Sequence, residues 1–164
     1  TDQLLDLDAC AGTVAPVASP SGIRVCGMAF GPGGDLYGLD SDTDQLIRFD
    51  LTTGEGLPIG SLGIDLGECG LTYDCSSGAL IGVNAPTQEM FEIDVVTGQA
   101  QQVVVLDVPL TSVGLAFEPR SGLVLAATNA AYVEIDPATG FATQLADFPV
   151  GAQVSEFAFH PSCP

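Results

Sequence analysis

The stretch that decides the fold runs from residue 114 to residue 140 and reads GLAFEPRSGLVLAATNAAYVEIDPATG. It holds three short segments in which side-chain character alternates with a period of two. Turn residues follow the first segment at Ser121-Gly122 and the third at Asp136–Gly140. This alternation indicates β-strands whose side chains point to opposite faces of a sheet. The stretch therefore predicts three strands of an antiparallel sheet.

The same pattern recurs about every 43 residues along the 164-residue chain. The aromatic residues of the first strand are 43, 44 and 42 residues apart, and the Asp residues that end the third strand are 42, 44 and 42 apart. Two independent landmarks thus keep one register, which marks a repeat architecture. The landmarks are Phe30, Tyr73, Phe117 and Phe159 in the first strand, and Asp8, Asp50, Asp94 and Asp136 in the third.

Each full repeat predicts four strands, A to D, which in the first repeat lie near 27–31, 35–40, 45–50 and 57–62. Four strands in 40–45 residues is the size of a β-propeller blade. The segments GLAFEPRSGLVLAAT and YVEIDPATGFATQL resemble the repeats of secreted bacterial β-propellers related to quinoprotein-like and surface-layer-like propellers. The resemblance covers nearly the whole chain and implies an all-β propeller fold. It implies no activity, because such propellers serve as enzymes, binders and scaffolds.

The repeat begins and ends out of phase with the chain, so we predict one propeller domain over 1–164 with a split blade. Strands C and D of that blade fall in 1–22, and its A strand falls in 153–164 as Glu156–His160. Three full blades occupy 23–66, 67–110 and 111–152. A B strand for the split blade is missing from the sequence.

Three arrangements follow from the missing strand. The chain forms a four-bladed ring whose last blade is thin or re-paired, or the half-blades pair between molecules to give an oligomer or filament, or the chain is a fragment of a longer ring. An unpaired sheet edge invites a strand from elsewhere. The strands expected to carry assembly contain Leu5 and Leu7 at the N-terminus, and Phe157 and Phe159 at the C-terminus.

The charge balance limits the partners. The net charge is −18, there is no Lys, and the basic residues are Arg24, Arg48 and Arg120. Such a surface disfavours nucleic acids and anionic membranes, and no apolar stretch approaches the roughly 20 residues of a membrane helix. Because the chain starts at Thr1 and carries five Cys, we expect a mature secreted or cell-surface protein from an oxidising compartment.

The five cysteines predict a disulfide framework. Cys26 and Cys69 directly precede the Gly that opens strand A in adjacent repeats, so we pair them. Cys10 and Cys163 lie in turns that emerge on one side of the split blade, so a disulfide between them would lock it within one chain or between chains. Cys75 is then left as a buried thiol or as a link between subunits.

Few residues suggest chemistry. The single His, His160, lies between Phe159 and Pro161, and we expect a structural or surface role. The recurring Asp residues before the turns are expected to cap those turns. One acidic loop, with Asp40, Asp42 and Asp44, is a candidate calcium site, although the Gly and Glu of the calcium-loop signature are absent.

We therefore expect a non-catalytic extracellular structural propeller that assembles with itself through the split blade. The alternative is a monomeric four-bladed propeller that binds a glycan, a peptide or a calcium ion. No nucleic acid, membrane insertion or cofactor other than calcium is expected.

Overall fold

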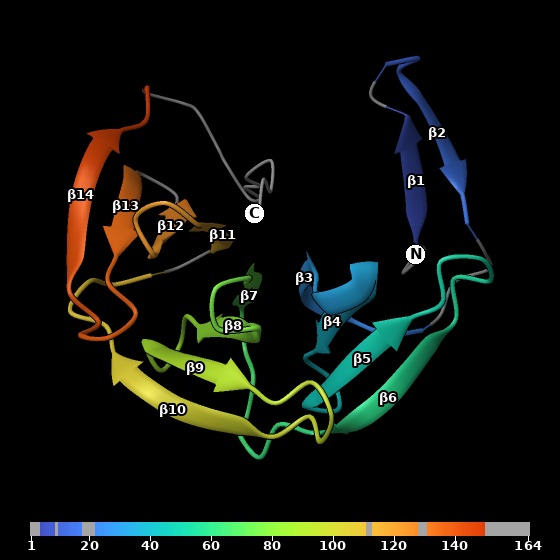
Figure 1. Cartoon of the computed structure of the whole chain (residues 1–164), viewed down its shortest axis with the longest axis horizontal. Coiled ribbons are helices and arrows are strands. Elements are labelled where there is room, and N and C mark those ends of the chain that lie inside the picture. Colours follow the sequence, from blue (N-terminus) through green and yellow to red (C-terminus); the bar gives the residue numbers. More distant parts are fainter. Residues whose placement is uncertain (1–3, 9, 18–21, 111–112, 128–130, 150–164) are drawn as a thin grey trace.

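In the residues that it describes, a computed structural model of the chain shows three four-stranded antiparallel sheets and one two-stranded antiparallel sheet. The structure describes residues 4–8, 10–17, 22–110, 113–127 and 131–149. We call the four-stranded sheets blades 1, 2 and 3, and the two-stranded sheet the N-terminal hairpin. They follow one another around an arc, with the N-terminal hairpin at one end and blade 3 at the other (Figure 1).

The strands lie within two residues of the predicted bounds in the first repeat and follow the predicted order. The N-terminal hairpin pairs β1 (Leu5–Asp8) with β2 (Thr13–Pro16). Blade 1 contains β3 (Val25–Phe30), β4 (Leu36–Asp40), β5 (Gln45–Phe49) and β6 (Gly56–Ser61), with the short 3₁₀ turn η1 (Pro32–Gly34) after β3. Blade 2 contains β7 (Cys69–Asp74), β8 (Ala79–Asn84), β9 (Glu89–Ile93) and β10 (Ala100–Val105). Blade 3 contains β11 (Gly114–Glu118), β12 (Leu123–Ala127), β13 (Ala131–Ile135) and β14 (Ala142–Asp147).

The prediction of four-stranded antiparallel blades is thus confirmed for three repeats, and strands C and D of the split blade are present as the N-terminal hairpin. The predicted A strand of the split blade, Glu156–His160, lies outside the described residues, as do Phe157, Phe159 and Cys163.

The innermost strands of neighbouring blades, β3, β7 and β11, pack on one another near the centre of the arc (Figure 1). Their backbones approach so closely that a side chain would not fit at two positions. A Cβ on Gly27 would lie 2.8 Å from the backbone N of Leu71, and a Cβ on Gly70 would lie 2.6 Å from the carbonyl O of Val113. The hydroxyl of Thr72 accepts a hydrogen bond of 2.9 Å from the N–H of Phe117 across the same contact. Glycine is therefore required where the inner strands cross.

Each blade has two apolar faces because its side chains alternate. We call the face toward the preceding blade the rear face and the face toward the following blade the front face. The front face of blade 1 and the rear face of blade 2 bury one core, which includes Tyr37, Leu39, Leu46, Leu71, Leu80 and Phe91. The front face of blade 2 and the rear face of blade 3 bury a second core, which includes Ile81, Val83, Met90, Leu115, Phe117 and Val124. The packing between blades therefore supplies most of the hydrophobic core.

A smaller cluster lies on the rear face of blade 1. It consists of Leu36, Ile47 and Phe49, with Leu4, Ile23 and Val25 packed against it. Leu4 connects the N-terminal hairpin to blade 1. This contact is much smaller than the two cores between full blades.

Substituting Gly70 tests the close approach of the inner strands. We expect Gly70→Ala to lower the free energy of unfolding by about 1–3 kcal/mol, because the new Cβ meets backbone that cannot rotate away. Chemical denaturation measures the loss. Gln101→Ala, at an exposed position of β10, is the control and should change stability by less than about 0.5 kcal/mol. Equal stability of Gly70→Ala and the wild type would contradict the account.

Candidate assembly site at the split blade

The N-terminal hairpin is exposed on both faces. Every residue of β1 and β2 is exposed. Leu5 and Leu7 have 53% and 64% of their surface exposed. They occupy the places of Ile47 and Phe49 in blade 1, and those two residues are only 1% and 5% exposed. In blades 2 and 3 the same row, Phe91 and Ile93 or Val133 and Ile135, lies in the core formed with the preceding blade. Among the described residues, no preceding blade covers the row of the split blade.

A second exposed pair lies on the innermost strand of blade 1. Met28 and Phe30 on β3 are 46% and 59% exposed, whereas Leu71 and Leu115, at the place of Met28 in blades 2 and 3, are 3% and 5% exposed. Leu71 and Leu115 are covered by the A and B strands of the preceding blade. The N-terminal hairpin brings only strands C and D, and Met28 and Phe30 therefore remain open.

The turn of the N-terminal hairpin also lacks a neighbour. A Cβ on Gly98 would lie 2.7 Å from the carbonyl O of Gly60, and one on Gly140 would lie 2.6 Å from that of Val105, so these turns contact the outer strand of the preceding blade. At the equivalent Gly12, a Cβ would meet nothing within 4 Å. Among the described residues, two contacts are thus incomplete: the rear face and turn of the N-terminal hairpin lack a preceding blade, and Met28 and Phe30 lack the A and B strands of the split blade.

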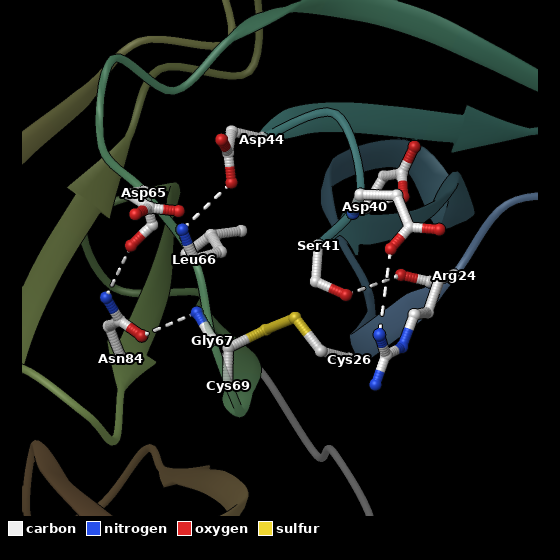
Figure 2. Close-up of a disulfide and its surroundings, with 11 residues drawn as sticks. Arg24, Cys26, Asp40, Ser41, Asp44, Asp65, Leu66, Gly67, Cys69 and Asn84 are labelled. Atoms are coloured by element: carbon white, nitrogen blue, oxygen red, sulfur yellow. Dashed lines mark hydrogen bonds and ion pairs between the residues drawn. A yellow bond between two sulfur atoms is a disulfide. The ribbon is translucent and has the colours of Figure 1, made fainter.

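The predicted disulfide between Cys26 and Cys69 is present (Figure 2). It joins β3 to β7, the innermost strands of blades 1 and 2, across a sequence separation of 43 residues. That separation equals one repeat, so the bond connects the same place in adjacent blades. Close by, the buried amide of Asn84 accepts a hydrogen bond from the N–H of Gly67 and donates one to the carbonyl O of Asp65 (Figure 2). These contacts position the chain between blades 1 and 2 just before Cys69.

The remaining cysteine predictions need correction. Cys10 carries a free, exposed thiol, so the predicted Cys10–Cys163 disulfide is not formed. The turn that holds Cys10 is exposed, and a Cβ on its Gly12 would meet nothing within 4 Å. Cys75 is disulfide-bonded and packs against the core between blades 2 and 3, so the prediction of a free or intermolecular thiol is wrong.

The thiol assignments give a direct test. Alkylation of the native, unreduced protein should label Cys10 and leave Cys26, Cys69 and Cys75 unlabelled, as read by peptide mass mapping. Replacing Cys26 and Cys69 together by Ala should destabilise the protein by about 2–4 kcal/mol, since the bond closes a long loop in the unfolded chain. Cys10→Ala, the control, should leave stability unchanged. Labelling of Cys26 without prior reduction would refute the assignment.

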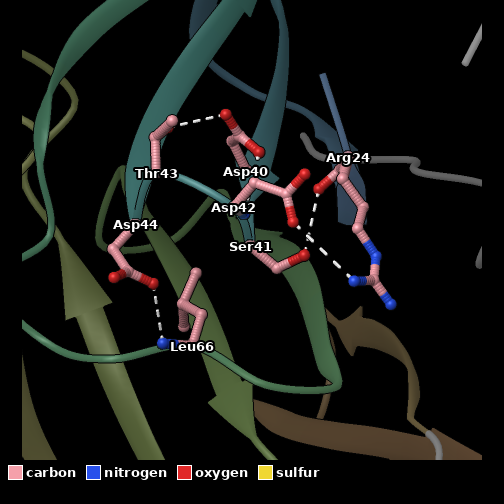
Figure 3. Close-up of polar contacts among 7 residues, drawn as sticks. All are labelled: Arg24, Asp40, Ser41, Asp42, Thr43, Asp44 and Leu66. Atoms are coloured by element: carbon pink, nitrogen blue, oxygen red, sulfur yellow. Dashed lines mark hydrogen bonds and ion pairs between the residues drawn. The ribbon is translucent and has the colours of Figure 1, made fainter. Parts of the chain in front are cut away.

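The acidic loop between β4 and β5 does not assemble the predicted calcium site, because its three carboxylates point in different directions (Figure 3). Asp40 is buried and accepts hydrogen bonds from the N–H of Asp42 and the hydroxyl of Thr43. Asp42 forms an exposed ion pair with Arg24 at 3.7 Å. Asp44 accepts a hydrogen bond of 2.8 Å from the N–H of Leu66. In the described part of the chain, no three His, Cys, Asp or Glu side chains are placed to hold a metal ion.

Asp44 has an equivalent in blade 2 that explains its role. Asp44 and Gln88 both adopt a left-handed backbone, with φ of 54° and 57°. The Asp44 carboxylate binds the N–H of Leu66, and the Gln88 amide oxygen binds the N–H of Leu110, each at 2.8 Å. The neutral amide of Gln88 accepts the same hydrogen bond as the carboxylate of Asp44. This position therefore needs a hydrogen-bond acceptor and does not need a charge. This pair was not predicted from the sequence because the two residue types differ, although their spacing of 44 residues, about one repeat, was a usable signal.

The repeated Asp residues cap the turns between strands C and D, as predicted. One carboxylate oxygen of Asp50 accepts hydrogen bonds from the backbone N–H groups of Thr52, at 2.7 Å, and Thr53, at 3.0 Å. The bonds from Thr53 and Thr52 hold the pKa of Asp50 below its ordinary value of 3.8. The pKa of Asp94 is lowered in the same way by the N–H groups of Val96 and Thr97. These carboxylates therefore act within the backbone of their own turns.

The turns between strands A and B use the same device. Burial raises the pKa of Asp74, but its hydrogen bonds from Ser76 and Ser77 together outweigh that effect, and its pKa is lowered. A hydrogen bond from Ser121 is the largest cause of the lowered pKa of Glu118. Both acids are thus anchored in structural contacts.

These shifts predict a pH dependence. The pKa of Asp94 is lower in the folded protein than 3.8, so ionisation favours folding above about pH 4, and this contribution disappears as the pH falls through the folded value. We expect Asp94→Ala to destabilise the protein at pH 7 and to cost progressively less from pH 4 to pH 2. Chemical denaturation of the Asp94→Ala variant and of the wild type at each pH gives the difference between their free energies of unfolding. The effect of net charge is common to both proteins and cancels in this difference. Glu92→Ala, which removes an exposed carboxyl of β9, is the control. A constant penalty across the range would contradict the prediction.

No protein-family model matches the chain, and no curated protein does. Solved structures do match it. A protein of unknown function from Bacteroides thetaiotaomicron matches with a TM-score of 0.70 at 14% identity over 92% of this chain. A chain of the nidogen/laminin complex matches with a TM-score of 0.64 at 17% identity over 87% of this chain. Virginiamycin B lyase from Staphylococcus aureus matches with a TM-score of 0.58 at 14% identity over 88% of this chain.

At these identities the likeness concerns the fold alone, and that fold is of the β-propeller type. The chain spans about half the length of these structures, since the matched parts are 46%, 57% and 48% of the three chains. In each of them the chain therefore continues beyond the part that corresponds to this arc.

Proposed function

We propose that the chain is a non-catalytic, extracellular structural protein that assembles with copies of itself through the split blade. The observation that carries the proposal is the exposed row of Leu5 and Leu7, whose equivalents in blade 1 are buried. Exposed contiguous apolar surface marks interaction sites. In blades 2 and 3 the equivalent rows are covered by the front face of the preceding blade, and we assign this place on the N-terminal hairpin to a blade of a second copy.

The extracellular part of the proposal is supported by the Cys26–Cys69 disulfide, since such bonds persist in oxidising compartments. Among the described residues, none forms a helix with the length and apolar character needed to cross a bilayer. The non-catalytic part is supported by the acids described above, which are occupied by turn and loop contacts.

The molar mass in solution tests the proposal. We expect the wild-type mass to exceed 16.7 kDa and to rise with concentration, as measured by light scattering. Leu5→Asp with Leu7→Asp should reduce the mass to that of the monomer, because the added charges oppose burial of the row. Leu51→Asp with Val96→Asp adds equal charge at exposed apolar residues in turns of blades 1 and 2 and should still assemble. A wild type that remains at 16.7 kDa at all concentrations would overturn the proposal.

A further inference from the structure

Among the described strands, β1 is paired along one edge only. In the three blades the third strand, β5, β9 or β13, is paired on both sides. β1 holds the third-strand place of the split blade, but among the described strands it pairs with β2 alone. The backbone groups on its other edge are therefore placed to pair with an extended segment.

The surface beside this edge is apolar. Met28 and Phe30 lie at the places of Leu71 and Tyr73 in blade 2. In the core between blades 1 and 2, Leu71 packs in one cluster with Tyr37 and Leu39 of the second strand, β4. A second strand in the split blade would therefore pair with β1 and cover Met28 and Phe30 at the same time.

We propose that the open edge of β1, together with Met28 and Phe30, binds an extended strand of a partner protein by strand addition. This site is distinct from the Leu5 and Leu7 row on the rear face, so it goes beyond the proposed self-association. In the interfaces between the blades, β4 and β8 fill the equivalent place, so the occupant that continues this packing is an extended strand.

The register between the second and third strands defines the partner sequence. In blade 1, Tyr37 lies opposite Arg48 and Leu39 opposite Leu46, and these two residues face the next blade. Asp6 and Leu4 hold the places of Arg48 and Leu46 in the N-terminal hairpin. The partner therefore carries bulky apolar side chains at the two positions opposite Asp6 and Leu4, and these side chains cover Met28 and Phe30.

The position between those two is restricted to a small residue. In blade 2, Gly82 lies opposite Phe91, and a Cβ on it would come within 2.4 Å of the ring. In blade 3, Ala126 lies opposite the smaller Val133. In the N-terminal hairpin, Leu5 holds the place of Phe91 and Val133. The partner residue opposite Leu5 is therefore Gly or Ala. The partner pattern is bulky apolar, small, bulky apolar.

The negative charge of this chain also limits the charge of the partner strand. Asp6 and Asp8 lie on β1, and the chain as a whole carries a net charge of −18. An acidic strand would be repelled on approach and would place like charges side by side. The partner strand is therefore uncharged or basic.

A peptide from the chain's own repeat is a suitable probe. Residues 78–85, GALIGVNA, contain β8, an uncharged strand of blade 2 with this pattern. The peptide can be made with blocked ends and a fluorescent label. Anisotropy titration with the full chain should show saturable binding, and amide exchange in β1 should slow when the peptide is bound. Phe30→Ser should weaken binding about tenfold or more, because it removes the largest apolar contact.

Two controls make the result specific. Leu57→Ser replaces a similarly exposed residue on β6 and should leave the affinity within about twofold of the wild type. The peptide with Ile81→Asp should bind at least about tenfold more weakly. Because a monomeric chain can still bind the peptide, this result does not depend on self-association.

Three outcomes would overturn the inference. The first is no binding of GALIGVNA to the wild type or to the Phe157→Asp, Phe159→Asp double variant. The second is binding that Phe30→Ser leaves unchanged. The third is binding to that double variant alone, which would assign the place to the chain's own C-terminal segment.

Discussion

A four-stranded blade has two apolar faces and no core of its own, so every blade depends on close contact with the blade before it and the blade after it. The contact is closest at the innermost strands, where Gly27 and Gly70 let neighbouring backbones meet. A side chain at either position would hold the strands apart and open the cores on both sides of the crossing. The Cys26–Cys69 bond lies beside this contact and joins the two strands covalently.

This dependence explains where the molecule is incomplete. Blades 1 and 2, and blades 2 and 3, cover each other's faces, and their residues are buried. The same rule requires a neighbour behind blade 1, yet the N-terminal hairpin supplies only two strands there. Met28 and Phe30 are open for that reason, and the unmet packing requirement directs the functional proposals to this end of the arc.

Much of this architecture could be predicted from sequence, because strand alternation and repeat spacing are local properties. The spacing also identified the Cys26–Cys69 disulfide, since both residues hold one place in adjacent repeats. The states of Cys10 and Cys75 could not be predicted, because they depend on which turns have neighbours in space. The acidic loop was misjudged because its carboxylates are taken up by structural hydrogen bonds. Asp40 accepts one from the N–H of Asp42 in its own turn, and Asp44 accepts one from the N–H of Leu66, which becomes its neighbour only after folding.

The acidic surface makes contact at the split blade more selective. Two copies of a chain with a net charge of −18 repel each other over distances set by the Debye length, about 8 Å at physiological ionic strength. Association is then favourable only where buried apolar area outweighs that repulsion, and each fully buried Leu or Phe contributes about 1.5–3 kcal/mol. Leu5 and Leu7 supply such area on the rear face of the N-terminal hairpin. Leu51, Val96 and Leu145 are also exposed, but they lie on turns or outer strands of three different blades. The charge therefore suppresses contacts there more effectively than at the split blade.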